Sequence, residues 1–274
     1  MNICADMAEV LNKILREKKL EVAVARENIP EEALREQLIG LAPCRNFYRT
    51  LTVRNPRGIN VIAEIKKASP SAGVIRRDFD PAAIAHIYQD CGAEAISVLT
   101  DEVFFQGRLD YLKQVKESVS VPVLRKDFII DPYQVYESRV AGADAILLIA
   151  EALKPAELMD LMILSNSLGL TVLLEVHELD SLLQYRSLVG WPQARYSLMG
   201  INNRNLKTMK TDLSTSIRLS EFVEDKNDLV SESGIRTRDD VENLIQAGFC
   251  GILIGETLMR SDDIAGRFTE LFNP

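Results

Sequence analysis

Glu64 and Lys66 lie two residues apart at the end of an apolar stretch that is typical of a buried strand. Side chains at this spacing on a strand point to the same side, so one site could hold both an acid and a base. The chain then enters the loop Ser69-Pro70-Ser71 and reaches Gly73. A strand that emerges into solvent also carries charges, so this stretch alone is compatible with either a catalytic site or a solvated strand end.

The same kind of stretch recurs along the chain. Apolar, β-branched runs end near positions 66, 99, 125, 149, 175, 202, 232 and 255, and helical stretches lie between them. Several helical stretches close on Gly beside Ala, a pair that ends a helix in a left-handed turn. Eight units from residue 60 onwards average about 27 residues each, which predicts an α/β fold of the (β/α)8 TIM-barrel type. An open doubly wound sheet is the weaker alternative, because no glycine-rich dinucleotide motif follows the first strand.

The segment before the first predicted strand has a different pattern. Apolar residues at helical spacing over positions 3–15 predict an amphipathic helix, and Pro30–Gly40 predicts a second one. The Pro and Gly residues between positions 43 and 58 indicate a loop. This segment has too little apolar surface to fold alone. We therefore predict an N-terminal helical extension, residues 1–59, that packs on a barrel formed by residues 60–274.

Composition excludes several classes of function. The net charge is −8, the pI is about 5.0 and no basic block is present, so we expect neither a nucleic-acid nor a membrane-surface partner. Four scattered Cys without a CxxC pair, and only two His, argue against a zinc site and indicate reduced thiols in the cytoplasm. The charges at positions 16–19 interrupt the apolar N-terminal residues, so we expect no signal peptide or membrane span.

In a (β/α)8 barrel, active sites form at the C-terminal ends of the strands. Acidic, basic and polar side chains occupy that position in five predicted strands, and they are Glu64, Lys66, Lys126, Glu175, Asn202, Arg204, Glu232 and Ser233. Any one of them could belong to a solvated rim, but a barrel built only for stability does not need the whole set. Two Lys and two Glu in one cavity can tune one another's pKa and exchange protons with a substrate. The alternative, a Schiff-base lysine, is disfavoured by neighbouring carboxylates.

The last two predicted strands end in turns that are typical of a phosphate site. Ser233-Gly234-Ile235 and Gly255-Glu256-Thr257 place backbone N–H groups, and a short helix starting near Thr257, where an anion can bind. The alternative interpretation is that both segments are ordinary βα turns that bind no ligand. Because a carboxylate repels phosphate, we predict that Glu256 offers its backbone N–H and points its side chain away.

Three aromatic or imidazole side chains near the same face are less specific. Phe105 and Phe128 follow the second and third predicted strands and could line an apolar slot for an aromatic ring, or simply anchor their loops. His177 follows Glu175 by two residues. We interpret His177 as a residue that makes a local hydrogen bond rather than as a general base.

The chain resembles the indole-3-glycerol-phosphate synthase family. The matching segments occur in family order from residue 60 onwards, and they are residues 63–71, 124–129, 173–177, 200–206, 231–235 and 253–259. The resemblance implies closure of 1-(2-carboxyphenylamino)-1-deoxyribulose 5-phosphate to indole-3-glycerol phosphate with loss of CO2 and water. It also implies no metal and no organic cofactor. Because the sequence stops just after the eighth predicted helix, we expect no fused second enzyme of the pathway. We expect a monomer whose only partner is this sugar phosphate with its anthranilate ring.

The resemblance also assigns roles by position. Lys126 is similar to the general acid that protonates the ketone, with Glu175 holding it, and Glu64 and Lys66 resemble the base and acid of the dehydration. The remaining positions implied by the family are Asn202 and Ser233 for sugar hydroxyls, Arg204 and Ser69 for anions, Gly234, Gly255 and Glu256 for the phosphate, and Phe105, Phe128 and Leu147 for the ring. Some relatives carry Ser at the position of Glu256.

Two other classes of function remain to be compared. Phosphoribosylanthranilate isomerase and the tryptophan synthase α-subunit share the phosphate site but do not need Lys66 and Lys126 together with two glutamates. A barrel that only binds a metabolite or a protein should have lost at least one acid–base residue, and all of them are present here.

Overall fold

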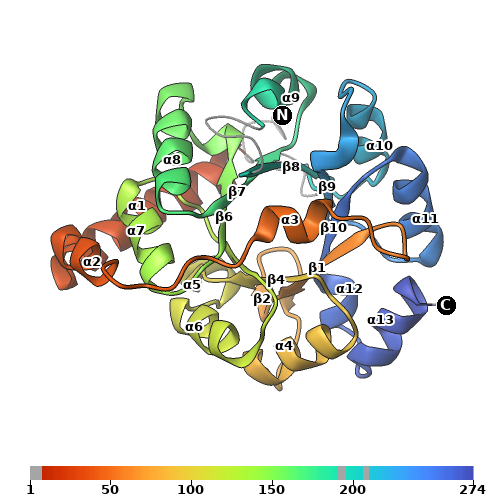
Figure 1. The fold of residues 1–274 in the computed structure, drawn as a ribbon, viewed down its shortest axis with the longest axis horizontal. Helices are drawn as coiled ribbons and strands as arrows, with labels where there is room; N and C mark the ends of the chain where they lie inside the picture. The colour runs from red at the N-terminus through yellow and green to blue at the C-terminus, as the bar shows by residue number, and fades with distance from the viewer. Residues whose placement is uncertain (1–7, 190–195, 206–209, 274) are drawn as a thin grey trace.

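The computed structural model describes residues 8–189, 196–205 and 210–273, and its centre is a closed barrel of eight parallel strands (Figure 1). Neighbouring strands pair in the cyclic order β1-β10-β9-β8-β7-β6-β5-β4. This confirms the predicted TIM barrel, and each predicted strand end lies within about one residue of the observed end. The strands are β1 Asn60–Ile65, β4 Ala95–Leu99, β5 Val123–Lys126, β6 Ala145–Ile149, β7 Thr171–Val176, β8 Ser197–Asn202, β9 Leu229–Glu232 and β10 Gly251–Ile254.

Helices between the strands form the outer layer of the barrel (Figure 1). Gly92, Gly142 and Gly248 have φ between 88° and 93°, so the Gly-Ala pairs do end helices in left-handed turns, as predicted. The helices after the strands are α4 Pro81–Asp90, α5 Glu102–Phe105, α6 Leu109–Ser118, α7 Pro132–Val140, η1 Ala150–Ala152, α8 Pro155–Ser167, α9 Leu179–Tyr185, η2 Arg186–Leu188, α10 Ser214–Ser220, η3 Lys226–Asp228, α11 Arg238–Ala247, α12 Glu256–Met259 and α13 Ile264–Phe272.

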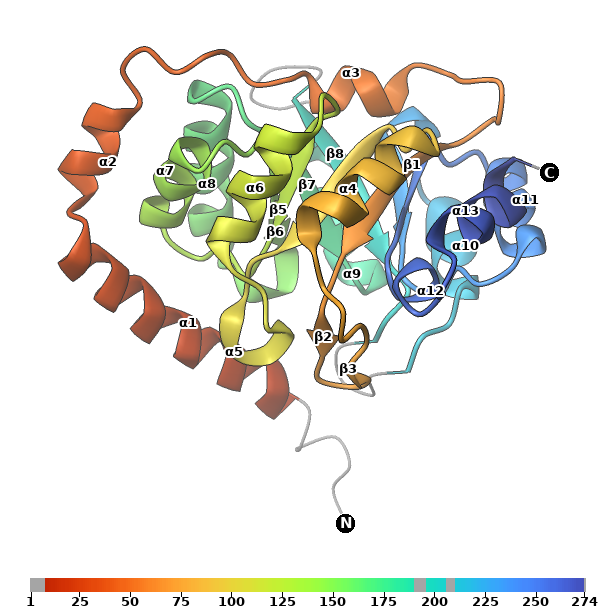
Figure 2. The ribbon, with the colours of Figure 1, turned by 90° about the horizontal axis from the view of Figure 1, so that it is seen from below.

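In the described part of the chain, three helices precede the barrel, and two of them, α1 and α3, lie at its opposite ends (Figure 2). Helix α1, Ala8–Asn28, runs past α5 at the C-terminal end of the strands, and α2, Glu31–Gln37, contacts α7. The part of the first predicted helix at positions 3–7 lies outside the described residues. The second predicted helix is confirmed.

The predicted loop between positions 43 and 58 is wrong in its centre, because it contains helix α3, Phe47–Thr52. Its side chains Phe47 and Leu51 are fully buried against the interior of the barrel, in contact with Ile62, Leu124 and Val230 among others. Flanking Pro and Gly residues mark the ends of this short segment. The burial of Phe47 and Leu51 in the end of the barrel stabilises the helix between them, although the local sequence favours a loop. Helix α3 therefore closes the end of the barrel opposite to α1 (Figure 2).

Period-two alternation separates the inner and outer faces of each strand. Inner residues such as Ile62, Leu124, Leu173 and Val230 pack together in the centre of the barrel. The next residues on the same faces, two positions further towards the C-terminal end, are Glu64, Lys126, Glu175 and Glu232. The strand geometry therefore gathers charged side chains directly above an apolar core.

Two short strands, β2 Ala68–Ser69 and β3 Gly73–Val74, pair antiparallel in the loop after β1, at the same end of the barrel as α1 (Figure 2). None of the helices in the described part of the chain has the length and apolar character needed to cross a membrane.

Candidate active site

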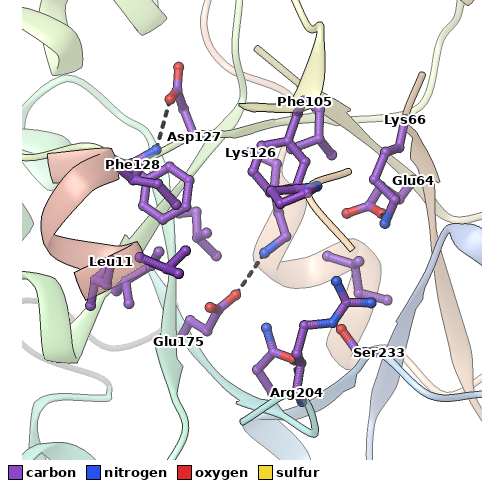
Figure 3. Close-up of a pocket in the computed structure, with 18 residues that line it drawn as sticks. Leu11, Glu64, Lys66, Phe105, Lys126, Asp127, Phe128, Glu175, Arg204 and Ser233 are labelled. Carbon is purple, nitrogen blue, oxygen red and sulfur yellow. Dashed lines mark hydrogen bonds and ion pairs between the residues drawn. The ribbon is translucent and has the colours of Figure 1, made fainter. Parts of the chain in front are cut away.

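A pocket opens at the C-terminal end of the barrel, below helix α1 (Figure 3). It encloses about 870 Å³ of space, including the part that is open to solvent. Ten of the predicted site residues line it: Glu64, Lys66, Phe105, Lys126, Phe128, Leu147, Glu175, Asn202, Arg204 and Ser233. Strands that lie far apart in the sequence therefore bring this predicted set together.

Lys126 extends into the pocket from the end of β5 and is held by carboxylates (Figure 3). Its Nζ donates a hydrogen bond of 2.7 Å to Oε2 of Glu175 and lies 3.1 Å from Oε2 of Glu232. Burial alone would lower the pKa of Lys126, but Glu175, Glu232 and Glu64 outweigh it and raise the pKa above its usual value. The amine is therefore protonated in the free enzyme, as a general acid must be.

Glu232 is a buried carboxyl that we had placed at a strand end without a role. Burial is the main cause that raises its pKa, to about 8, and the negative charge of Glu175 adds to this although Lys126 opposes it. Glu175 behaves in the opposite way. Burial disfavours its charged form, but Lys126 and His177 hold the pKa of Glu175 well below its usual range. Of these two neighbouring carboxyls, Glu175 is ionised at neutral pH and Glu232 is protonated.

The buried Glu232 should make the free energy of unfolding of the wild type fall as the pH rises. We expect Glu232→Gln to abolish this contribution. Between pH 4.5 and about 8 the unfolded chain has released the Glu232 proton and the folded chain still holds it, so this group makes folding less favourable as the pH rises. The amide has no such proton. Urea unfolding at pH 5, 6.5 and 8 should show the variant gaining more than about 1 kcal/mol on the wild type across this range. If the free energies of unfolding of the two proteins changed by the same amount between pH 5 and pH 8, the neutral state of Glu232 would be contradicted.

Glu64 and Lys66 form a second acid–base pair on the opposite wall of the pocket (Figure 3). The two side chains are buried and hydrogen-bonded to each other. Gly255 explains how this pair fits, because a Cβ at that position would overlap the Glu64 carboxylate. Gly200 makes room for Glu232 in the same way. We had predicted Gly255 as a backbone position close to a ligand, and its neighbour in the structure is the side chain of Glu64.

Apolar residues form the remaining wall. The rings of Phe105 and Phe128 are 6.3 Å apart between centroids and tilted by 38°, and Leu147 lines the same pocket. Helix α1 also contributes to the lining through Val10, Leu11 and Ile14. The other lining residues that we did not predict are Pro70, Leu99, Asp127, Ile149 and Leu253. An aromatic ring of a ligand can therefore be shielded from water by both the barrel and the N-terminal helix.

The polar edge of the pocket leads into a second cavity that shares Arg204. Gly234 and Glu256 line this second cavity, whereas Gly255 and Ser69 line neither. Ser69 is buried, and its Oγ accepts the N–H of Ala72.

Arg204 is the cation between the two cavities. It donates to Oγ of Ser71 at 3.1 Å and lies 3.5 Å from Oε2 of Glu256. Its buried Nε has no acceptor within the described part of the chain, which leaves a donor for an anion. Asn202 accepts the backbone N–H of Arg204 through its Oδ1, which ties the two side chains to one turn.

Ser233 has φ of 68°, a left-handed conformation that costs a non-glycine residue about 1 kcal/mol. Glu256 begins α12, within one residue of the helix start that we predicted. Its Oε1 accepts from Nε of Arg260 at 2.9 Å. Although burial opposes it, this contact lowers the pKa of Glu256.

His177 lies behind Glu175 and outside the pocket lining. It is buried and contacts Glu151 as well as Glu175. It is therefore in no position to act as a general base on a ligand in this pocket. Among the described residues, no group of three or more His, Cys, Asp or Glu side chains could hold a metal ion.

A closed barrel with acid–base side chains above its core and an adjoining anion edge defines the chain as a (β/α)8-barrel enzyme. The profile of the indole-3-glycerol phosphate synthase family matches residues 11–271. The indole-3-glycerol phosphate synthase of Neisseria meningitidis serogroup B is 47% identical over 269 residues, 97% of this chain and 100% of the relative. That of Rhodopirellula baltica is 46% identical over 255 residues, 93% of this chain and 95% of the relative. The chain belongs to the indole-3-glycerol phosphate synthase family, a family of carboxy-lyases in tryptophan biosynthesis.

Solved structures of lower identity share the fold. The 3-hexulose-6-phosphate synthase of Salmonella typhimurium superposes with a TM-score of 0.60 at 13% identity, over 78% of this chain and 96% of that one. The thiamine phosphate pyrophosphorylase of Pyrococcus furiosus gives a TM-score of 0.55 at 15% identity, over 79% and 96%. At these identities the likeness concerns the barrel alone.

Proposed function

We propose that this chain closes 1-(2-carboxyphenylamino)-1-deoxyribulose 5-phosphate to indole-3-glycerol phosphate and that Lys126 is the general acid. The observation that carries the proposal is the ammonium of Lys126, which lies 2.7 Å from Glu175 and 3.1 Å from Glu232 beside an apolar wall. This arrangement offers a proton to an oxygen atom next to a bound aromatic ring. The proposed substrate has such an oxygen atom in its ketone and such a ring in its anthranilate part.

In the first step, the ring carbon that bears the carboxylate attacks the ketone carbon, and Lys126 protonates the ketone oxygen. Loss of CO2 then leaves the bonding electron pair on the ring carbon, which restores aromaticity without a base. No metal is needed for either event in this scheme. Glu175 holds the Lys126 ammonium in place, and Phe105 and Phe128 hold the ring so that the two carbons meet.

The second half of the reaction removes water. Lys66 gives a proton to the departing hydroxyl and Glu64 takes a proton from the pyrroline ring, so that the indole double bond forms. Their buried pairing on the wall opposite to Glu175 supports this division of roles. Asn202 and Ser233 orient the sugar hydroxyls, and Leu147 packs under the ring.

The phosphate binds at the edge formed by Arg204 and the turns after β9 and β10. Arg204 supplies a guanidinium, and Gly234, Gly255 and Glu256 supply backbone N–H groups. Ser69 supports the loop after β1, from which the neighbouring Ser71 reaches Arg204. The product carries the same phosphate group, so the same contacts bind it in this scheme.

We expect Glu256→Ala to leave the KM for the substrate within about twofold, because its backbone N–H remains and its carboxylate, which contacts Arg260 and more distantly Arg204, does not bind the phosphate in this scheme. Arg204→Met is the matched comparison. It should raise KM at least tenfold, since a charged hydrogen bond contributes about 1.5–3 kcal/mol. Steady-state kinetics on both variants measure this. A large rise in KM for Glu256→Ala would contradict the backbone-only role.

We also propose that residues 1–59 act as an extension of one catalytic unit with the barrel, residues 60–274, and that the enzyme works as a cytoplasmic monomer. Three observations support the joint catalytic unit and the location. Helix α1 lines the pocket, α3 fills the other end of the barrel, and the cysteines Cys44, Cys91 and Cys250 are free thiols. The acidic net charge of −8 supports the absence of a nucleic-acid partner.

A turnover assay tests the proposed function. Purified protein is mixed with the carboxyphenylamino-deoxyribulose phosphate, and the fluorescence of the indole product is followed in EDTA and, in parallel, with magnesium. We expect equal rates in both. No indole above background in either condition would end this proposal, and a strict dependence on magnesium would exclude the metal-free scheme.

A further inference from the structure

His177 is the one imidazole in the described chain that is buried between carboxylates. Its Nδ1 lies 3.0 Å from Oε2 of Glu151, in the 3-10 helix η1 after β6. Its Nε2 lies 3.1 Å from Oε1 of Glu175, in a contact that is too bent for a good hydrogen bond and is best described as an ion pair. The backbone N–H of His177 also donates to Oε1 of Glu151 at 2.9 Å.

A neutral imidazole does not fit this position. It carries one N–H and one bare nitrogen, so an electron-rich nitrogen without a proton would lie about 3 Å from a carboxylate oxygen. The side chain is 3% exposed, which leaves little room for a water molecule to relieve that repulsion. Only the doubly protonated imidazolium has no bare nitrogen in either contact and places a positive charge between the two carboxylates.

The surroundings of His177 balance such a charge. Glu151 and Glu175 are its direct neighbours, and Lys126 and Glu232 are the next groups beyond Glu175. Tyr185 of α9 is the other titratable group near Glu151. Burial alone would lower the pKa of His177, but the two glutamates raise it to about 10.

We propose that His177 is a positioning residue that stays an imidazolium and holds Glu175 as a carboxylate aimed at Lys126, with Glu151 as its anchor. The row Lys126–Glu175–His177–Glu151 then alternates in charge. Without the imidazolium, burial would favour the protonated form of Glu175, and a protonated Glu175 would no longer hold the ammonium in place. The effect on turnover rests on the proposed role of Lys126, whereas the charge state of His177 does not.

Nitrogen NMR of the wild-type enzyme tests the charge state directly. The chain has only two histidines, and the exposed His86 is assigned by its loss in His86→Gln. We expect both ring nitrogens of His177 to give the signals of protonated nitrogen from pH 6 to 8.5. A signal of a bare ring nitrogen for His177 at pH 7.5 would overturn the proposal, whether or not the enzyme makes indole. In Glu151→Gln, the imidazolium signals of His177 should disappear at a lower pH than in the wild type.

Kinetics test the positioning role. His177→Gln keeps a side-chain N–H but removes the charge, and we expect kcat to fall about tenfold or more with KM within about twofold. The pKa of Glu175 should rise when the cation is lost, so the acidic limb of the kcat profile should move to higher pH by about one unit. His86→Gln is the matched control and should change neither kcat nor the pH of the acidic limb. A lower kcat with an unmoved acidic limb would reduce His177 to a packing role and contradict the proposal.

Discussion

Replacing Lys126 with Met should lower kcat by at least about 10²-fold, the usual loss on removal of a general acid, and by up to about 10⁴-fold. Methionine has a similar length and shape, but it has no proton to give to the ketone oxygen. KM should change little, because the apolar wall and the phosphate edge remain. The comparison is made by steady-state kinetics with indole fluorescence.

The Lys126→Met protein should still fold, which makes its kinetics interpretable. Glu175 keeps its contact with His177, and Glu232 is already protonated at neutral pH, so neither carboxyl becomes an isolated buried charge. Lys113→Met, at an exposed position of α6, is the matched control and should retain full turnover. Turnover of Lys126→Met within about threefold of the wild type would remove Lys126 from the mechanism.

Lys18→Met should destabilise the protein by about 3–5 kcal/mol, the range found when one member of a buried charge cluster is removed. Lys18 is a buried residue of α1, and its Nζ lies 2.9 Å from both Asp101 and Asp127. Burial alone would lower the pKa of Lys18, but the two aspartates raise it above its usual value. Its loss leaves the two aspartates buried, with Arg125 as the remaining cation beside Asp127 among the ion pairs of the described residues.

The same change should also weaken substrate binding. Asp101 accepts the N–H of Phe104 and so caps the short helix of Phe105, and Asp127 accepts the N–H of Phe128. Lys18 therefore fixes α1 to the two turns that carry the aromatic wall. We expect KM to rise at least fivefold in Lys18→Met.

Lys19→Met is the matched control for both effects, because Lys19 is exposed on the same helix. Its unfolding free energy should stay within about 0.5 kcal/mol of the wild type. Urea unfolding and steady-state kinetics on the two variants decide the matter. Equal stability of Lys18→Met and Lys19→Met would contradict the docking role of Lys18.

The barrel was predictable because its signals are local and repeated. Most strands are mainly apolar, as in β6, and a turn such as the one at Gly142 restarts the pattern. Helix α3 was missed because its stability comes from Phe47 and Leu51 filling the end of a barrel that is formed by residues far along the chain. No local pattern reports such packing.

The site was predictable where it follows strand alternation. Glu64, Lys126, Glu175 and Glu232 each lie two positions beyond a core residue, and all four were placed at the C-terminal strand ends from the sequence. The contact of His177 with Glu151 depends on the pairing of β6 with β7 and on the turn that follows β6, and the contact of Lys18 with Asp101 depends on how α1 docks. These tertiary contacts leave no trace in residue spacing.

The role of Lys126 as the acid that protonates the ketone is tested most directly by a crystal structure with the borohydride-reduced substrate. This analogue carries an alcohol in place of the ketone and cannot close. We predict that its alcohol oxygen lies within about 3.2 Å of Nζ of Lys126, with the ring against Phe105 and Phe128 and the phosphate at Arg204. An alcohol oxygen that instead contacts Lys66 and lies beyond hydrogen-bond reach of Lys126 would contradict this account.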